Sequence, residues 1–137
     1  MMRRPSIPVL GVRRAIVVDD SRAMRHMLRD ALEQSGFEVI EAADGADALA
    51  KLTSAPPPEL ALVDWNMPEL NGLSLIRFLR SNHKFDRMVI VMVTSETEAS
   101  QIQRALAAGA DEYIMKPLSA DMLLDKIRML EEAEPRR

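Results

Sequence analysis

Three stretches of the chain are apolar at every position rather than at alternate positions. They cover residues 15–18, 60–63 and 88–93. A parallel strand covered on both faces of its sheet has this pattern, because neither face meets water. Each stretch runs directly into polar side chains, namely Asp19 and Asp20, Asp64, and Thr94. Since carboxylates are costly to bury, the pattern predicts buried strands whose ends emerge at an edge of the sheet.

Two weaker strand patterns complete the set. Residues 37–42 alternate between apolar and polar positions, which suits a strand at a sheet edge, and residues 112–115 form a short strand before Lys116 and Pro117. Helical periodicity fills the intervals. We expect helices from Ser21 to Gly36, from Ala46 to the prolines at 56–58, around residues 73–79, over 96–108, and after a cap at Ser119.

The resulting order, strand then helix five times over, predicts an α/β fold. In such a fold a parallel sheet carries helices on both faces, joined by right-handed crossovers. Ligands then bind outside the carboxyl ends of the strands. Five polar residues follow four of the predicted strands at that edge: Asp19 and Asp20 after the first, then Asp64, Thr94 and Lys116. Each alone could be a helix cap or a turn residue, but their coincidence at one edge favours a functional site.

Asp19 and Asp20 also indicate what the site binds. Two adjacent carboxylates repel, and each raises the pKa of the other unless a cation lies between them. A hard divalent ion that prefers oxygen ligands relieves this repulsion. The pair therefore predicts Mg²⁺.

Composition narrows the class of protein. The chain has 137 residues, a formal net charge of −3 and no cysteine. This predicts one domain, argues against nucleic-acid binding, and excludes disulfides, thiolate metal sites and thiol nucleophiles. No apolar stretch is long enough for a membrane span, and the run before Arg13 is broken by Pro8 and makes a poor signal peptide. We expect a cytoplasmic monomer with no membrane or nucleic-acid partner.

The domain limits follow from the same patterns. Residues 1–13 are expected to be a flexible arm, residues 14–132 the folded domain, and residues 133–137 a short tail.

From Arg14 to Leu130 the chain closely resembles the receiver domain of bacterial two-component response regulators, and most of all the stand-alone chemotaxis type. The matching features are the loop Asp64-Trp65-Asn66-Met67-Pro68 with Gly72, the acidic pair Asp19-Asp20, the hydroxyl of Thr94, the aromatic ring of Tyr113, and Lys116-Pro117. The resemblance implies a flavodoxin-like, doubly wound sheet of strand order 2-1-3-4-5 with five helices.

It also implies roles for the site residues. Asp64 would accept a phosphoryl group from a histidine kinase or phosphotransfer protein. Asp20, Asp64 and the backbone carbonyl of Asn66 would ligate Mg²⁺, with Asp19 acting largely through water. Lys116 and the Thr94 hydroxyl would each pair with a phosphoryl oxygen, and the Lys116-Pro117 peptide bond would be cis.

Output is expected to come from the domain's own surface, because the chain ends just after its last helix. By resemblance, Thr94 and Tyr113 form the switch, and Ile102, Tyr113 and Lys126 lie on the partner surface of the fourth helix, fifth strand and fifth helix. The partner would be a flagellar motor switch or a phosphorelay component. The protein would be a binding switch and not a conventional enzyme.

The sequence leaves two questions open, one about function and one about a surface. A Mg²⁺-dependent aspartyl phosphatase acting on a small substrate would also use an aspartate nucleophile, but such enzymes carry a second acid where this chain has Asn66, and they need a cap over the substrate.

One side of the first helix carries three arginines, Arg22, Arg25 and Arg29. They could form a docking stripe for a phosphodonor or simply a solvated face.

Overall fold

The computed structural model describes residues 6–9, 11–67, 70–95 and 100–132. Within this part of the chain, five parallel strands form one sheet in the order β2-β1-β3-β4-β5, as the resemblance implied. The strands are β1 (Arg13–Val18), β2 (Phe37–Ala42), β3 (Leu60–Asp64), β4 (Val89–Ser95) and β5 (Glu112–Lys116). The alternating strand β2 lies at an edge of the sheet, as its pattern predicted.

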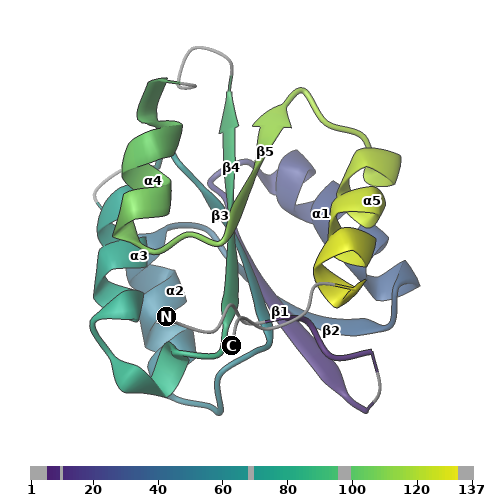
Figure 1. Cartoon of the computed structure of the whole chain (residues 1–137), viewed down its shortest axis with the longest axis horizontal. Coiled ribbons are helices and arrows are strands. Elements are labelled where there is room, and N and C mark those ends of the chain that lie inside the picture. Colours follow the sequence, from purple (N-terminus) through teal and green to yellow (C-terminus); the bar gives the residue numbers. More distant parts are fainter. Residues whose placement is uncertain (1–5, 10, 68–69, 96–99, 133–137) are drawn as a thin grey trace.

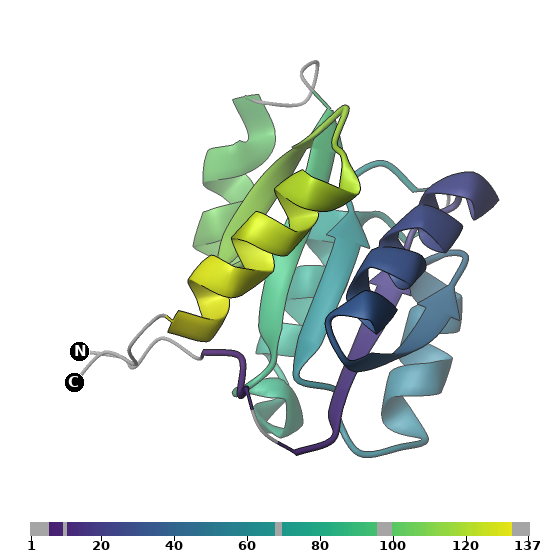
Figure 2. The ribbon, with the colours of Figure 1, turned by 90° about the vertical axis from the view of Figure 1, so that its right-hand side faces the viewer.

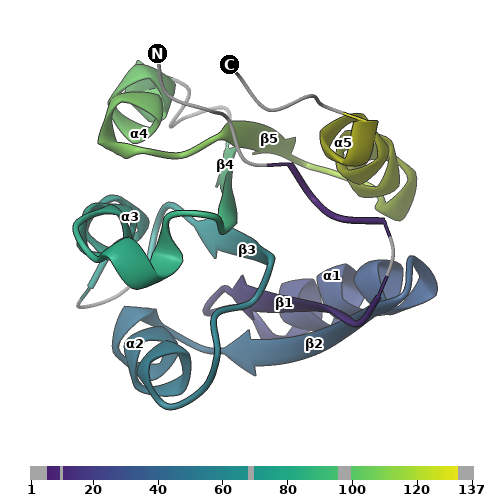
Figure 3. The same ribbon diagram turned by 60° about the horizontal axis from the view of Figure 1, so that its bottom comes forward.

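Helices cover both faces of the sheet. They are α1 (Arg22–Gln34), α2 (Gly45–Thr53), α3 (Gly72–Arg80), α4 (Ile102–Ala108) and α5 (Ala120–Glu132), with a short 3₁₀ helix, η1 (His83–Phe85), after α3. Helices α2, α3 and α4 pack on one face, and α1 and α5 pack on the other (Figures 1 and 3). Figure 2 looks onto the face that α1 and α5 cover. No helix in the described ranges is long and apolar enough to cross a membrane.

The two layers explain why three strands are apolar throughout. Ile16 and Val18 of β1 join the apolar cluster beneath α2, α3 and α4, whereas Ala15 and Val17 join the cluster beneath α1 and α5. Strands β3 and β4 divide their side chains between the two clusters in the same way. Every residue of β3 is buried, including Asp64 at its end. The expectation that the carboxylates emerge at the edge of the sheet holds only for Asp20, which is exposed, because Asp19 and Asp64 are almost completely buried there.

The helix starts agree with the predicted caps where the sequence offered a clear one. The Ser21 hydroxyl accepts a hydrogen bond from the Met24 amide at 3.2 Å, and the Ser119 hydroxyl accepts one from the Met122 amide at 3.2 Å. Each bond satisfies an amide that the helix itself leaves without a partner.

The fourth helix is shorter than its periodicity suggested. It begins at Ile102 after a 3₁₀ turn at residues 100–101, and residues 96–99 of the predicted helix lie outside the described part of the chain. Arg80 fixes the C-terminal end of α4 by hydrogen bonds. The Arg80 guanidinium donates to the carbonyls of Gly109, Phe85 and Met88 and pairs with Asp111, each at 2.8 Å. One partly buried arginine thus joins the ends of α3 and α4 to the start of β4.

The predicted flexible arm is packed at Ile7. This side chain is only 1% exposed and joins the apolar cluster beneath α1 and α5, and its amide donates to the Leu130 carbonyl at 3.3 Å. Burying an isoleucine stabilises by roughly 2 kcal/mol, so the arm differs here from the loose segment expected. Residues 1–5, 10 and 133–137 lie outside the described part, and the predicted domain limits stay a prediction.

Candidate functional site

The parallel sheet brings the predicted site residues to one edge. Asp19 follows β1 directly, Asp64 is the last residue of β3, and Lys116 is the last residue of β5. The register aligns these ends, because Asp64 pairs with Val93 of β4 and Lys116 pairs with Ser95. Thr94 lies near the end of β4, between the two, and is completely buried.

Three carboxylates meet at this edge. One oxygen from each of Asp19, Asp20 and Asp64 lies within 4.8 Å of the others. Asp19 and Asp64 are 1% and 4% exposed, whereas Asp20 is exposed to solvent. The cluster is therefore open to water on the side of Asp20 and closed on the side of the sheet.

The donor set of this cluster fits a hard divalent cation. Asp19 Oδ1 accepts the Ser21 amide at 2.8 Å, whereas the buried Asp19 Oδ2 accepts no hydrogen bond of good geometry within the described part of the chain and has only the Lys116 ammonium near it, at 3.5 Å. A buried carboxylate oxygen left in this state is costly. A cation held by carboxylate oxygens would satisfy it, and the acidic cluster is of the type that holds Mg²⁺ in receiver domains.

Lys116 is the cationic side chain at the cluster. Its Nζ lies 3.2 Å from Asp64 Oδ1 and 3.5 Å from Asp19 Oδ2, so one ammonium bridges the two buried carboxylates. The Lys116-Pro117 peptide bond is cis, as the resemblance implied.

The site shifts the pKa values of its own groups. Burial, reinforced by the neighbouring charge of Asp19, raises the pKa of Asp64 to about 6, although Lys116 and the Asn66 backbone amide act in the opposite direction. Burial alone would lower the pKa of Lys116, but the carboxylates of Asp64 and Asp19 raise it above its usual value. Lys116 therefore stays charged at neutral pH, and ionised Asp64 is the strained member of the pair.

The loop after β3 is held close beneath Asp64. The Gly72 amide donates to the Trp65 carbonyl at 3.0 Å, and a Cβ on Gly72 would lie 2.4 Å from the Asp64 carbonyl oxygen. Only glycine fits there. The exposed residue Asn66 follows within this loop, and Pro68 of the predicted motif lies outside the described residues.

The predicted switch residues lie on neighbouring strands. Register pairs Thr94 with Met115 and Met92 with Tyr113, so Thr94 and Tyr113 face the α4 side of the sheet two positions apart. Tyr113 is half-buried, and Lys126 Nζ lies 5.8 Å from its ring centroid and 3.6 Å from Glu112 Oε1. Ile102, at the start of α4, is half-buried on the same side.

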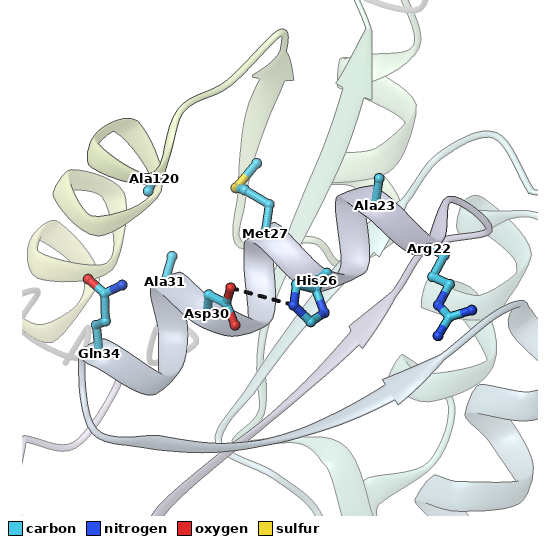
Figure 4. A pocket seen from close by; sticks show the side chains of 8 residues that line it. All are labelled: Arg22, Ala23, His26, Met27, Asp30, Ala31, Gln34 and Ala120. Carbon is cyan, nitrogen blue, oxygen red and sulfur yellow. Dashed lines mark ion pairs between the residues drawn. The ribbon is translucent and has the colours of Figure 1, made fainter.

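The arginines of α1 do not form a uniform stripe. Arg25 and Arg29 are half-buried and both pair with Glu41 on β2, whereas Arg22 is exposed. Arg22 instead lines a shallow surface hollow along α1 that Ala120 of α5 closes at one side (Figure 4). His26 and Asp30 lie 3.8 Å apart in this hollow, and both side chains are exposed. The periodicity of α1 did not reveal the hollow, because it depends on how α5 packs beside it.

A model of the response regulator receiver domain matches residues 15–128 of this chain. The chain belongs to the response regulator receiver family. The match confirms the resemblance to receivers and the expectation of a signalling domain that is not a classical enzyme.

Relatives of this receiver include chemotaxis proteins. CheY1 of Helicobacter pylori is 38% identical over 116 residues, which cover 84% of this chain and 94% of that protein. The CheY homolog of Campylobacter jejuni is 39% identical over 113 residues, which cover 82% of this chain and 87% of that protein. The solved structure of the chemotaxis response regulator CheY4 of Vibrio cholerae has a TM-score of 0.81 at 32% identity and covers 88% of this chain and 99% of that one. The expected likeness to chemotaxis regulators is thus confirmed.

The raised pKa of Asp64 predicts a pH-dependent stability difference. Because Asp64 ionises near pH 6 when folded and near pH 4 when unfolded, the metal-free protein loses stability as the pH rises through this window. Asp64→Asn removes the carboxylate charge and so avoids this loss of stability. Urea unfolding in chelator should therefore show Asp64→Asn about 2 kcal/mol more stable than wild type at pH 7.5 and nearly equal to it at pH 4.

The control for this measurement is Asp125→Asn, on the exposed side of α5. It should change the free energy of unfolding by less than about 0.5 kcal/mol. Equal stability of wild type and Asp64→Asn at pH 7.5 would show that the Asp64 carboxylate is not strained.

Proposed function

We propose that this receiver accepts a phosphoryl group on Asp64, in a Mg²⁺-dependent reaction, from a histidine kinase or a phosphotransfer protein. The observation that carries the proposal is the position of Asp64, buried at the sheet edge within a three-carboxylate cluster and in contact with Lys116. A histidine kinase donor is the one that membership of the receiver family implies.

The chemistry needs positive charge more than it needs an acid or a base. An Asp64 oxygen attacks the phosphorus atom of phosphohistidine, a bond from phosphorus to that oxygen forms, and the bond to the histidine nitrogen breaks. Both reactants are anions, so positioning and compensation of charge lower the barrier. Mg²⁺, when bound by Asp19, Asp20, Asp64 and the Asn66 backbone carbonyl, would supply part of that compensation.

Lys116 supplies the remaining positive charge. In the unphosphorylated protein its ammonium lies against Asp64 Oδ1 and Asp19 Oδ2. A phosphoryl group on Asp64 offers stronger acceptors at the same place, and we propose that Lys116 turns to one of its oxygens. The buried Thr94 hydroxyl would donate to another oxygen from the neighbouring strand.

The change in partner binding would follow from the movement of Thr94 toward the phosphoryl group. Thr94 and Tyr113 face one side of the sheet on adjacent strands, so a shift of Thr94 toward the phosphoryl group makes room for the half-buried Tyr113 ring. The surface made by α4, β5 and α5, with Ile102, Tyr113 and Lys126, would then change shape and bind its partner. The similarity to chemotaxis proteins favours a flagellar motor switch as that partner over a phosphorelay component.

The first test is chemical. Incubation with acetyl phosphate and Mg²⁺ should add the mass of one phosphoryl group to the intact protein, and chelator should prevent the addition. Hydroxylamine should remove the group, as expected for an acyl phosphate. Asp64→Asn should gain nothing and Lys116→Ala should react more slowly, while Asp125→Asn should react as wild type does. A phosphoryl group retained by Asp64→Asn would refute the assignment.

The second test concerns the switch. Tyr113 is the only tyrosine of the chain, so its ring signals in the NMR spectrum need no selective assignment. Beryllofluoride, which mimics the phosphoryl group, should shift these signals in wild type and in Thr94→Ser, which keeps the hydroxyl. Thr94→Ala should bind beryllofluoride and show a reduced shift.

The matched control is Thr53→Ala, at the end of α2, which should behave as wild type. If Thr94→Ala shifted the Tyr113 ring as fully as wild type does, Thr94 would not couple the site to the output surface.

A further inference from the structure

Arg25 contacts the backbone of the acidic cluster from outside the site. Its Nη1 donates to the Asp19 carbonyl at 2.7 Å, and its Nε donates to Glu41 Oε1 at 3.2 Å. The side chain is 16% exposed, so the guanidinium is held between α1 and the end of β2. A planar guanidinium can serve both acceptors at once because its donors point in fixed directions.

The hydrogen bond from Arg25 to the Asp19 carbonyl fixes the peptide that joins Asp19 to Asp20. The Asp19 amide is fixed to the sheet by the Ala42 carbonyl at 3.1 Å, and Asp19 Oδ1 accepts the Ser21 amide. The Asp19 carbonyl belongs to the next peptide, which joins Asp19 to Asp20. The plane of that peptide sets the direction in which the Asp20 side chain leaves the backbone, and Asp20 is the exposed member of the cluster.

The Glu41 carboxylate offsets part of the positive charge that Arg25 brings to the cluster. Arg29, which also pairs with Glu33, contacts Glu41 from the other side, with its Nη1 2.8 Å from Glu41 Oε2. Lys51 donates to the Glu41 carbonyl at 2.6 Å and so fixes the same residue through its backbone. Glu41 is therefore a fixed anchor, and the position of Arg25 follows from it.

We propose that Arg25 is a positioning residue of the acidic cluster. By holding the Asp19-Asp20 peptide against α1, it pre-organises the three carboxylates for a divalent cation. This inference rests on the proposed function, because it assumes that the cluster binds Mg²⁺. Arg25 itself touches neither the ion nor the phosphoryl group. Residues that orient metal ligands typically contribute a factor of about 10 to 100 in metal affinity.

The chain provides a matched control. Arg29 also pairs with Glu41, yet its guanidinium makes no hydrogen bond to residues 19–21 among the described contacts. Arg29→Met therefore removes one contact of Glu41, which Lys51 still holds through its backbone carbonyl, and leaves the bond from Arg25 to the Asp19 carbonyl in place. Arg25→Met removes that bond. Arg25→Lys retains a donor that can reach one acceptor but not both.

The experiment is a Mg²⁺ titration followed by the fluorescence of Trp65, the only tryptophan of the chain and the neighbour of Asp64. Arg25→Met should raise the dissociation constant for Mg²⁺ by about tenfold or more, Arg25→Lys by less, and Arg29→Met should match wild type. If Arg25 acted mainly through its charge, its removal would strengthen binding of a cation, so unchanged or tighter binding in Arg25→Met would overturn the proposal.

A measurement without metal separates positioning from general destabilisation. In chelator, the Asp20 and Ser21 amides should change chemical shift and exchange faster with solvent in Arg25→Met, while amides of β5 stay as in wild type. Arg29→Met should leave all of them unchanged. Equal weakening of Mg²⁺ binding by both methionine variants would show that Glu41, and not the bond to Asp19, is responsible. If wild type itself showed no response to Mg²⁺, the proposed function would fail, and this inference with it.

Discussion

The repulsion between carboxylates at the end of the sheet is the constraint on which this structure depends. Asp19 and Asp64 are almost completely buried, and Lys116 is the ammonium that lies against both. Two buried carboxylates next to each other are unfavourable in the folded state unless cations compensate them. Burial, with the charge of Asp19 added to it, raises the pKa of Asp64 despite the nearby ammonium, so Lys116 offsets the cost of the ionised carboxylate only in part. A site left short of positive charge in this way is suited to bind a divalent cation and, with it, a phosphoryl group.

The surrounding fold keeps these groups together despite their repulsion. The parallel register sets the strand ends side by side, and Gly72 lets the loop after β3 return close to the Asp64 backbone. Arg25 and Ser21 hold the loop after β1 from the side of α1. On the opposite side of the sheet from α1, Arg80 fixes the end of α4.

Much of this could be predicted from the sequence because burial leaves a strong pattern. Uninterrupted apolar runs identify strands covered on both faces, and the polar residues after them identify the functional edge. Contacts that depend on how elements pack leave no such pattern. The bond from Arg25 to the Asp19 carbonyl depends on the rotation of α1 against β2, and in the sequence Arg25 is one of three equivalent arginines. The burial of Ile7 rests on a single apolar residue with no periodicity around it, and the 3₁₀ turn before Ile102 has a helix-like composition.

We propose that a divalent ion and a phosphoryl group on Asp64 complete the charge of this site. A crystal structure of the protein grown with Mg²⁺ and beryllofluoride tests it most directly. We expect beryllofluoride attached to an Asp64 oxygen, an ion in contact with the Asp19, Asp20 and Asp64 cluster, and Lys116 turned from Asp64 to a fluorine atom. A structure in which Lys116 still contacts Asp64, with neither group bound at the cluster, would contradict it.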